Sequence, residues 1–300
     1  MKKIFAGLLV LQFIFVYASF AQNKAAADTA KSKADADPAK PDSSGTGVAV
    51  SPSSLRFNVG PGGSKTLKLT MTNDTKKLEK FKLSFADFDM DTHGKTTTLP
   101  VNQYSKYGLS HFVSATPSFI ELKPGEKKQI EITLKIPNDE LLNKAMWSIL
   151  MIDEAEERKF ITPPKGNENQ MSMGVIPIFG FGVYIYNNPP NVKINKVEIT
   201  NFTYKKETKE GNEIRHVVIK AKNTGDGIGF CSSYIELTNL SNGEQKRLLV
   251  KRFTILPTQE RDFDYQLPKD LAPGRYSIAG VLDFGSKEEI EAAEMEISIP

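Results

Sequence analysis

The feature that most constrains this chain is an alternation of apolar and polar residues with a period of two. Turn formers such as Asn73-Asp74 and Pro137 bound the runs. A strand turns successive side chains to opposite faces, so the alternation indicates half-buried strands. No long segment has the 3.6-residue period of a helix, which predicts an all-β fold. The clearest runs place apolar residues at Leu67, Leu69 and Met71, at Phe81, Leu83 and Phe85, and at Ile130, Ile132, Leu134 and Ile136.

The strand-like runs form two groups separated by Asn187-Asn188-Pro189-Pro190. Consecutive prolines suit a stiff connection between domains. About seven short strands in each group, with turn signals between them, are typical of an immunoglobulin-like sandwich. We therefore predict two immunoglobulin-like β-sandwich domains, 48–188 and 191–300. The second group comprises runs at 194–202, 216–221, 231–237, 248–255, 276–284 and 294–299, with a hairpin signal at Asn242-Gly243.

The N-terminal segment predicts export from the cytoplasm. Residues 1–21 combine Lys2 and Lys3 with an apolar run and a small-residue cut after Ala21, the pattern of a cleaved signal peptide. The run is shorter than the ~20 residues that span a bilayer, so we expect no membrane span. Residues 22–47 hold no apolar side chain larger than Ala and are predicted to form a disordered tether. The expected location is the periplasm, with the extracellular space or cell surface as the alternative.

Composition argues against several classes of function. The 39 basic and 36 acidic residues give +3, and removal of Lys2 and Lys3 leaves 37 − 36 = +1. This near-neutral charge does not favour nucleic-acid binding. One cysteine forms no intramolecular disulfide, and three scattered histidines argue against a His-rich metal site or a His-based triad. We therefore expect a non-enzymatic protein without cofactor or metal, in which Cys231 is a buried strand residue.

Two charged clusters are interpreted as solvated. Asp87, Asp89 and Asp91 alternate at the end of a predicted strand. A calcium loop starting at Asp87 needs Gly at its sixth position and Glu at its twelfth, where this chain has Thr92 and Thr98. We interpret the three aspartates as a solvated strand end. A basic cluster is expected on the solvent side of a strand and its turn: Lys246, Arg247, Lys251 and Arg252.

The order of motifs resembles that of periplasmic pilus-assembly chaperones over roughly residues 48–300, and the chain is interpreted as a divergent member. The likeness rests on Ala49-Val50-Ser51-Pro52, the 64–73 run ending at Asn73, the segment from Ser114 to Leu122-Lys123-Pro124-Gly125-Glu126, and Phe181-Gly182-Val183-Tyr184-Ile185-Tyr186. A Tyr at 276, after Pro273-Gly274, resembles the corner Tyr of immunoglobulin-like domains. The resemblance implies two immunoglobulin-like sandwiches that bind pilus subunits by β-strand addition.

Strand addition requires an edge strand with bulky apolar residues at alternate positions. The candidate donor residues share odd positions in one segment: Met171, Met173, Val175, Phe179 and Phe181. The alternative is an ordinary strand that packs only within its own core. The resemblance further implies an Arg and a Lys that anchor the subunit's C-terminal carboxylate. Arg56 matches the Arg in one alignment, whereas the Lys position falls on Val183 or Tyr184.

These observations predict a non-enzymatic, chaperone-like periplasmic protein. Its expected partner is a protein subunit of a pilus or surface structure, bound through an edge strand, and an outer-membrane assembly protein is a second partner to consider. The alternative is a structural or adhesive cell-surface protein without a chaperone role.

Overall fold

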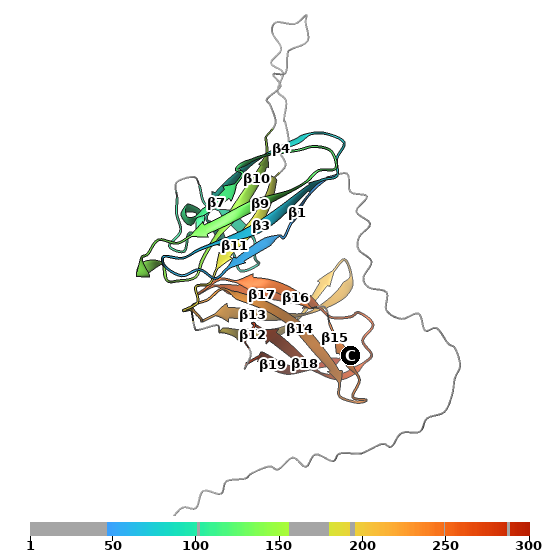
Figure 1. Ribbon diagram of the computed structural model, residues 1–300. Helices are drawn as coiled ribbons and strands as arrows, with labels where there is room; N and C mark the ends of the chain where they lie inside the picture. The colour runs from blue at the N-terminus through green and yellow to red at the C-terminus, as the bar shows by residue number, and fades with distance from the viewer. Residues whose placement is uncertain (1–46, 101–102, 156–179, 193–195, 249, 287–288) are drawn as a thin grey trace, which may run out of the picture. The chain divides into compact units, whose positions relative to one another are not determined.

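The computed structural model describes residues 47–100, 103–155, 180–192, 196–248, 250–286 and 289–300 (Figure 1). Every regular element among them is a strand, apart from the 3-10 turns η1 (Ser110–Phe112) and η2 (Glu140–Leu142). In η2 the side chain of Asp139 accepts the N–H of Leu141 at 2.9 Å, an N-terminal cap. No helix in the described part of the chain is long and apolar enough to cross a membrane.

The first sandwich consists of two facing sheets and a small hairpin. Its four-stranded sheet has the order β1 (Val48–Ser51), β3 (Ser64–Asn73), β9 (Lys127–Lys135) and β7 (Val113–Thr116). Its five-stranded sheet has the order β2 (Ser54–Phe57), β11 (Gly180–Asn187), β10 (Met146–Glu154), β4 (Glu79–Ala86) and β8 (Phe119–Leu122). The hairpin pairs β5 (Phe88–Met90) with β6 (Thr96–Thr98).

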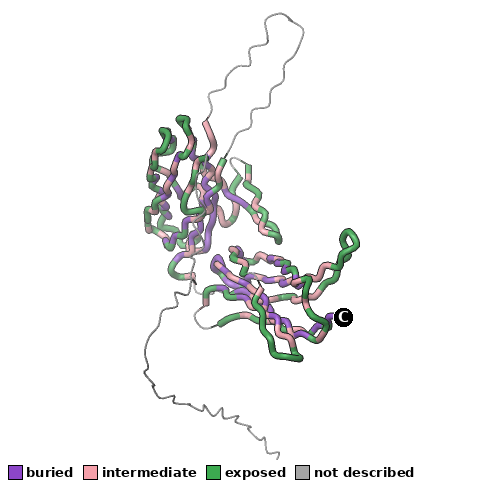
Figure 2. The backbone as a smooth tube through the Cα atoms, turned by 90° about the vertical axis from the view of Figure 1, so that its right-hand side faces the viewer, coloured by how far each residue is buried: buried purple, intermediate pink, exposed green. Residues whose placement is uncertain are grey.

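The alternation seen in the sequence produces the core between these sheets. Leu69 and Met71 on β3 and Ile132 on β9 are fully buried, whereas Lys68, next to Leu69, and Glu131, next to Ile132, are exposed. Figure 2 shows buried positions along the strands of both sandwiches. The period-two prediction is therefore confirmed, because each strand turns one set of side chains to the core and the other to solvent.

Both outer strands of the first sandwich change sheets part of the way along. The chain leaves β1, passes Pro52 and continues as β2 in the opposite sheet, and it does the same at Pro117 between β7 and β8. A proline has no N–H to donate to a ladder, which suits a residue where pairing with one sheet ends. Each change leaves part of a neighbouring strand without a partner among the described residues.

The second sandwich also consists of two sheets. One sheet has the order β12 (Val197–Lys209), β13 (Asn212–Asn223) and β17 (Glu260–Gln266). The other has β15 (Gln245–Arg247), β14 (Gly229–Asn239), β18 (Gly274–Asp283) and β19 (Glu291–Ile299), with β16 (Lys251–Ile255) also paired to β14. Gly243 has a φ of 74° at the predicted hairpin turn. The all-β, immunoglobulin-like sandwich class is confirmed.

The strands of both sandwiches belong to one compact unit, Ser44–Pro300. A cluster of buried residues joins them: Trp147, Ile149 and Tyr186 from the first sandwich pack in one cluster with Ile228 and Leu256 from the second. The carboxamide of Asn188 donates to the Ile228 carbonyl at 3.1 Å and accepts its N–H at 2.9 Å. These contacts bring β2 and β11 close to β14 and β16, where the candidate site lies.

Candidate functional site

Arg56 lies on the outer face of the five-stranded sheet. Leu55 and Phe57 on either side of it in β2 are buried in the core, so the alternation of the strand turns Arg56 outward. β2 pairs in parallel with β11, and this register places Arg56 opposite Tyr186. The guanidinium carbon of Arg56 lies 3.7 Å from the ring centre of Phe230 in β14, a cation–π contact.

A second arginine shares the surface hollow beside Arg56. Arg252 in β16 stands opposite Ser232 of β14. The hollow has a volume of about 370 Å³ and is lined by Arg56, Phe230, Cys231, Ser232, Arg252, Phe253 and Thr254. Among the described residues, no carboxylate forms an ion pair with either guanidinium. Two cations next to hydroxyl and aromatic groups favour an anionic group, such as a carboxylate, in this hollow.

The sequence placed Arg252 only in a solvated basic cluster. Its neighbours in that cluster are indeed engaged at the surface: Arg247 pairs with Glu236, and Lys251 lies 4.6 Å from the ring centre of Tyr265. What the sequence missed is that Arg252 lines the same hollow as Arg56, 196 residues earlier (252 − 56). The pairing of β16 with β14 brings the two together, and no local sequence signal reports that pairing.

The tyrosines of β11 give the site a neutral aromatic wall. Tyr186 lies 5.5 Å from Phe230 between ring centres, and Tyr184 lies 5.9 Å from Tyr186. Burial raises the pKa of the Tyr186 phenol to about 12, so it stays uncharged near neutral pH. Tyr184 exchanges a hydrogen bond of 2.9 Å with the Thr96 hydroxyl. Val183 is buried in the core. Neither of the two positions expected for a Lys therefore supplies a cation.

The starting half of β11 has one open side. The whole strand pairs with β10, but β2 covers only Tyr184–Asn187. The N–H of Tyr184 donates to the Ser53 carbonyl at 3.1 Å, so even-numbered residues direct their backbone groups toward β2. The N–H and C=O groups of Gly180 and Gly182 point the same way and find no strand there among the described residues.

Side chains at this open half are small or apolar. Phe181 is partly buried against the core, and its ring centre lies 6.2 Å from that of Phe81. Gly182 is closely packed, because a Cβ atom there would lie 2.8 Å from Cδ1 of Ile149, whose side chain would have to move. A Cβ atom on Gly180 would lie 2.9 Å from a carboxylate oxygen of Asp153. The open edge therefore carries no charged side chain between 180 and 183.

The other predicted donor residues, Met171, Met173, Val175 and Phe179, lie outside the described residues. Of the predicted partner-binding set, the structure describes Arg56 and Phe181. Both belong to neighbouring strands of the same sheet, Arg56 on its outer face and Phe181 toward the core.

The interpretation of the aspartate cluster is wrong for Asp87. This residue is 2% exposed, and its carboxylate accepts the backbone N–H groups of Ser105, Leu109 and Ser110 at 3.0–3.1 Å. The carboxylate thus holds the 105–110 loop in place. The three hydrogen bonds compensate for the loss of water around the buried side chain. Asp91 closes a turn by accepting the N–H groups of His93 and Lys95. No group of three or more metal-ligating side chains occurs in the part of the chain that the structure describes.

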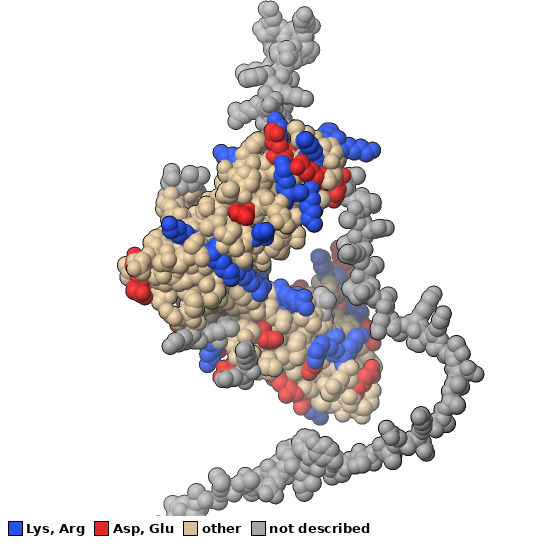
Figure 3. Space-filling view, viewed as in Figure 1, with Lys and Arg blue, Asp and Glu red and all other residues tan. Residues whose placement is uncertain are grey.

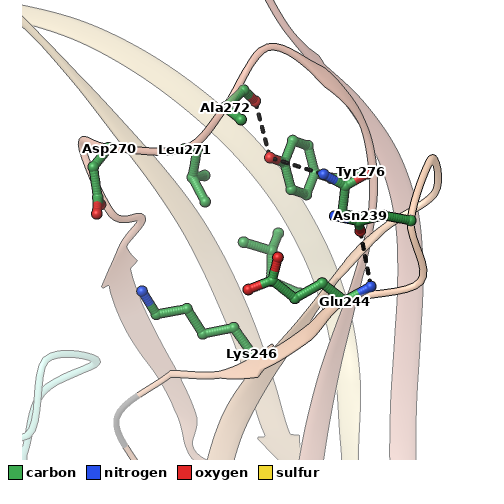
Figure 4. Close-up of a pocket in the computed structure, with 9 residues that line it drawn as sticks. Asn239, Glu244, Lys246, Asp270, Leu271, Ala272 and Tyr276 are labelled. Carbon is green, nitrogen blue, oxygen red and sulfur yellow. Dashed lines mark hydrogen bonds between the residues drawn. The ribbon is translucent and has the colours of Figure 1, made fainter.

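A separate hollow in the second sandwich surrounds Tyr276 (Figure 4). The Tyr276 hydroxyl donates to the Ala272 carbonyl at 2.9 Å, and the side chain is 4% exposed. The hydroxyl therefore ties the strand to the segment just before it, as in a tyrosine corner. Glu244, Lys246 and Asp270 surround the hollow with mixed charge, and these features indicate a structural corner.

No protein-family model and no curated protein matches this sequence. Solved structures do have a similar fold. The E. coli chaperone DraB is 17% identical, with a TM-score of 0.41, over 83% of this chain and 97% of its own. A chain of the chaperone–tip adhesin complex of CFA/I fimbriae biogenesis is 14% identical, with a TM-score of 0.40, over 83% of this chain and 97% of its own. The periplasmic chaperone SfaE is 13% identical, with a TM-score of 0.36, over 84% of this chain and 98% of its own.

These three likenesses extend over most of this chain at low sequence identity. At these identities and TM-scores they assign no function to this chain.

Proposed function

We propose that this protein is a non-enzymatic, chaperone-like periplasmic protein that binds a subunit of a pilus or surface structure by β-strand addition. The observation that carries the proposal is the open half of β11, where the backbone groups of Gly180 and Gly182 have no partner strand among the described residues and no charged side chain beside them. Natural proteins usually protect such an edge with charged residues or cover it, so an unprotected edge indicates a partner strand.

The bound strand would extend the five-stranded sheet in line with β2. Its backbone would accept from and donate to Gly180 and Gly182, which supplies affinity without dependence on sequence. Its alternate side chains would turn inward beside Phe181, which is only partly buried. This geometry selects an extended segment with apolar residues at every second position, which is how a subunit lacking a strand of its own sheet would be recognised.

The arginine hollow would hold the end of that strand. Arg56 follows directly in line with the position that the partner strand would occupy, and Arg252 lines the same hollow. A C-terminal carboxylate placed there would meet two guanidinium groups that have no acidic partner among the described residues. Arg252 would then supply the second positive charge that Val183 and Tyr184 do not.

A photo-crosslinking residue at Phe181 tests the proposal. The full chain carrying benzoylphenylalanine at that position would be irradiated in its native cell envelope, and the cross-linked peptide would be sequenced by mass spectrometry. We expect a single surface-structure subunit, cross-linked through a segment with apolar residues at alternate positions. A cross-link through an irregular surface loop would contradict strand addition, and the lack of any specific product would favour a structural or adhesive role.

A matched pair of proline variants sharpens the test. Gly180→Pro removes an N–H that points to the open side of β11, and a Cβ there collides only with the end of the Asp153 side chain, so the variant should lower the cross-link yield without breaking the ladder to β10. Lys68→Pro removes an outward N–H from the open part of β3 and serves as the control. Equal cross-linking in all three proteins would show that the β11 edge is not the binding surface.

A further inference from the structure

Within the part of the chain that the structure describes, the two sheet changes in the first sandwich leave four half-edges. A half-edge is the part of a strand that has no partner on one side, because the neighbouring segment of chain belongs to the other sheet there. The half-edges are β3 at 64–69, β11 at 180–183, β9 at 127–130 and β4 at 84–86. Any of them could pair with a strand from another molecule, yet the proposed function uses only one.

The β3 half-edge has open backbone groups like those of β11. The N–H of Asn73 donates to the Glu126 carbonyl, and the N–H of Ile136 donates to the Gly63 carbonyl, so odd-numbered residues of β3 face β9. Even-numbered residues, including Thr66 and Lys68, therefore direct their N–H and C=O groups to the open side. No strand among the described residues occupies that side between 64 and 69.

Two lysines distinguish this half-edge from that of β11. Lys65 stands opposite the fully buried Leu134, so it lies on the face turned to the core, although it is itself exposed. Lys68 lies on the outer face opposite Glu131. Figure 3 shows Lys and Arg side chains on the face of the molecule that carries the four-stranded sheet. An added strand would have to place apolar side chains beside Lys65 and desolvate its ammonium group.

The two remaining half-edges, on β9 and β4, are also poorly suited to pairing with a strand from another molecule. The β9 half-edge holds Lys127 and Lys128, and Lys128 donates to the Glu121 carbonyl at 2.5 Å. The β4 half-edge is only three residues long, and the next carbonyl, that of Asp87, already accepts the N–H of Leu99 at 2.8 Å. Among the described half-edges of at least four residues, β11 alone carries no lysine.

We propose that Lys65 and Lys68 are specificity-determining residues that keep strands from adding to β3 and so confine strand addition to β11. The identity of the permitted edge rests on the proposed function. The exclusion at β3 does not, because it follows from the charges on that strand. Without the two lysines, the β3 half-edge would pair with the same half-edge of a second copy of this chain.

The test is the self-association of the mature chain carrying Lys65→Val and Lys68→Val. We expect the weight-average mass in sedimentation equilibrium to rise with concentration toward twice the wild-type value. Amide exchange of residues 64, 66 and 68 should slow by at least about tenfold, because these N–H groups become hydrogen-bonded. A double variant with the wild-type mass at every concentration would overturn the proposal.

Two controls separate edge pairing from a general effect of lost charge. Lys220→Val with Lys222→Val makes the same change on β13, which is paired on both sides, and should leave the mass unchanged. Lys65→Val with Lys68→Pro removes the outward N–H and should abolish association. Association in either control would show that β3 pairing is not responsible. No partner subunit is present in these assays, so their failure would leave the proposed function standing.

Discussion

The backbone N–H of Tyr184 donates to the carbonyl of Ser53 at 3.1 Å, and this bond marks the boundary between the paired and open halves of β11. Beyond it toward Gly180, the described residues offer β11 no partner on that side. The residue before Ser53 is Pro52, where the chain crosses to the other sheet. The open edge is thus a direct consequence of the strand change.

Gly182 should be sensitive to the smallest side chain. We expect Gly182→Ala to lower the free energy of unfolding by about 1–2 kcal/mol, because its Cβ would overlap Cδ1 of Ile149. Ile149→Val removes that atom, so the double variant should lose less than the sum of the two single variants. Urea unfolding of the four proteins gives the coupling directly. Strict additivity would show that the two side chains do not collide.

Asn73 should be among the most stabilising polar residues of the first sandwich. It is fully buried, and its carboxamide donates to the Leu122 and Lys77 carbonyls at 2.9 and 2.8 Å. Asn73→Ala removes both of these buried hydrogen bonds and the one that its carbonyl oxygen accepts from the N–H of Thr75, and we expect a loss of about 2–3 kcal/mol in chemical denaturation. The exposed Asn212 provides the control, since Asn212→Ala should change the unfolding free energy by less than about 0.5 kcal/mol.

The two arginines of the hollow should contribute separately to partner binding. We expect Arg56→Ala and Arg252→Ala each to weaken binding of the captured subunit by roughly 10-fold or more, since each removes a charge-assisted hydrogen bond. Binding would be measured by titration with the purified subunit at two salt concentrations. A subunit whose C-terminus is amidated should be insensitive to both substitutions. An unchanged effect with the amidated subunit would exclude a carboxylate in the hollow.

Asp91 should titrate below its ordinary range. The backbone N–H groups of Lys95 and His93 stabilise its ionised form and lower its pKa. Because the folded-state pKa is depressed, its contribution to stability is present above the unfolded-state pKa and is lost as pH falls through the folded-state value. Carboxyl NMR titration checks the direction. The stability difference between wild type and Asp91→Ala should shrink over that acidic range, and a constant difference would contradict the assignment.

Cys231 should be unreactive in the native protein. It is 4% exposed in β14, and burial raises the pKa of its thiol to about 12. The thiolate is the reactive form, so labelling by a thiol reagent near pH 8 should be slow in buffer and fast in denaturant. Rapid labelling of the folded protein would show that β14 is open at this position. The measurement needs no substitution, because the chain has one cysteine.

The sequence by itself determined the local features. Alternation at Leu69, Met71 and Ile132 specifies strands with one buried face, and Asn242-Gly243 specifies a hairpin turn, because both depend only on neighbouring residues. The burial of Cys231 followed from its place in such a run. The prediction that Asp87 is solvated was wrong because its burial depends on distant residues. Its carboxylate accepts hydrogen bonds from N–H groups 18 to 23 residues away.

Only the tertiary structure decided which strand half is open and which residues surround Arg56. Strand pairing is long-range, and a period of two states which side chains share a face but not which strand lies alongside. The same alternating pattern therefore describes β3, which carries lysines at its open half, and β11, which carries glycines. The joining of Arg56, Phe230 and Arg252 likewise depends on contacts between distant strands, which no local pattern encodes.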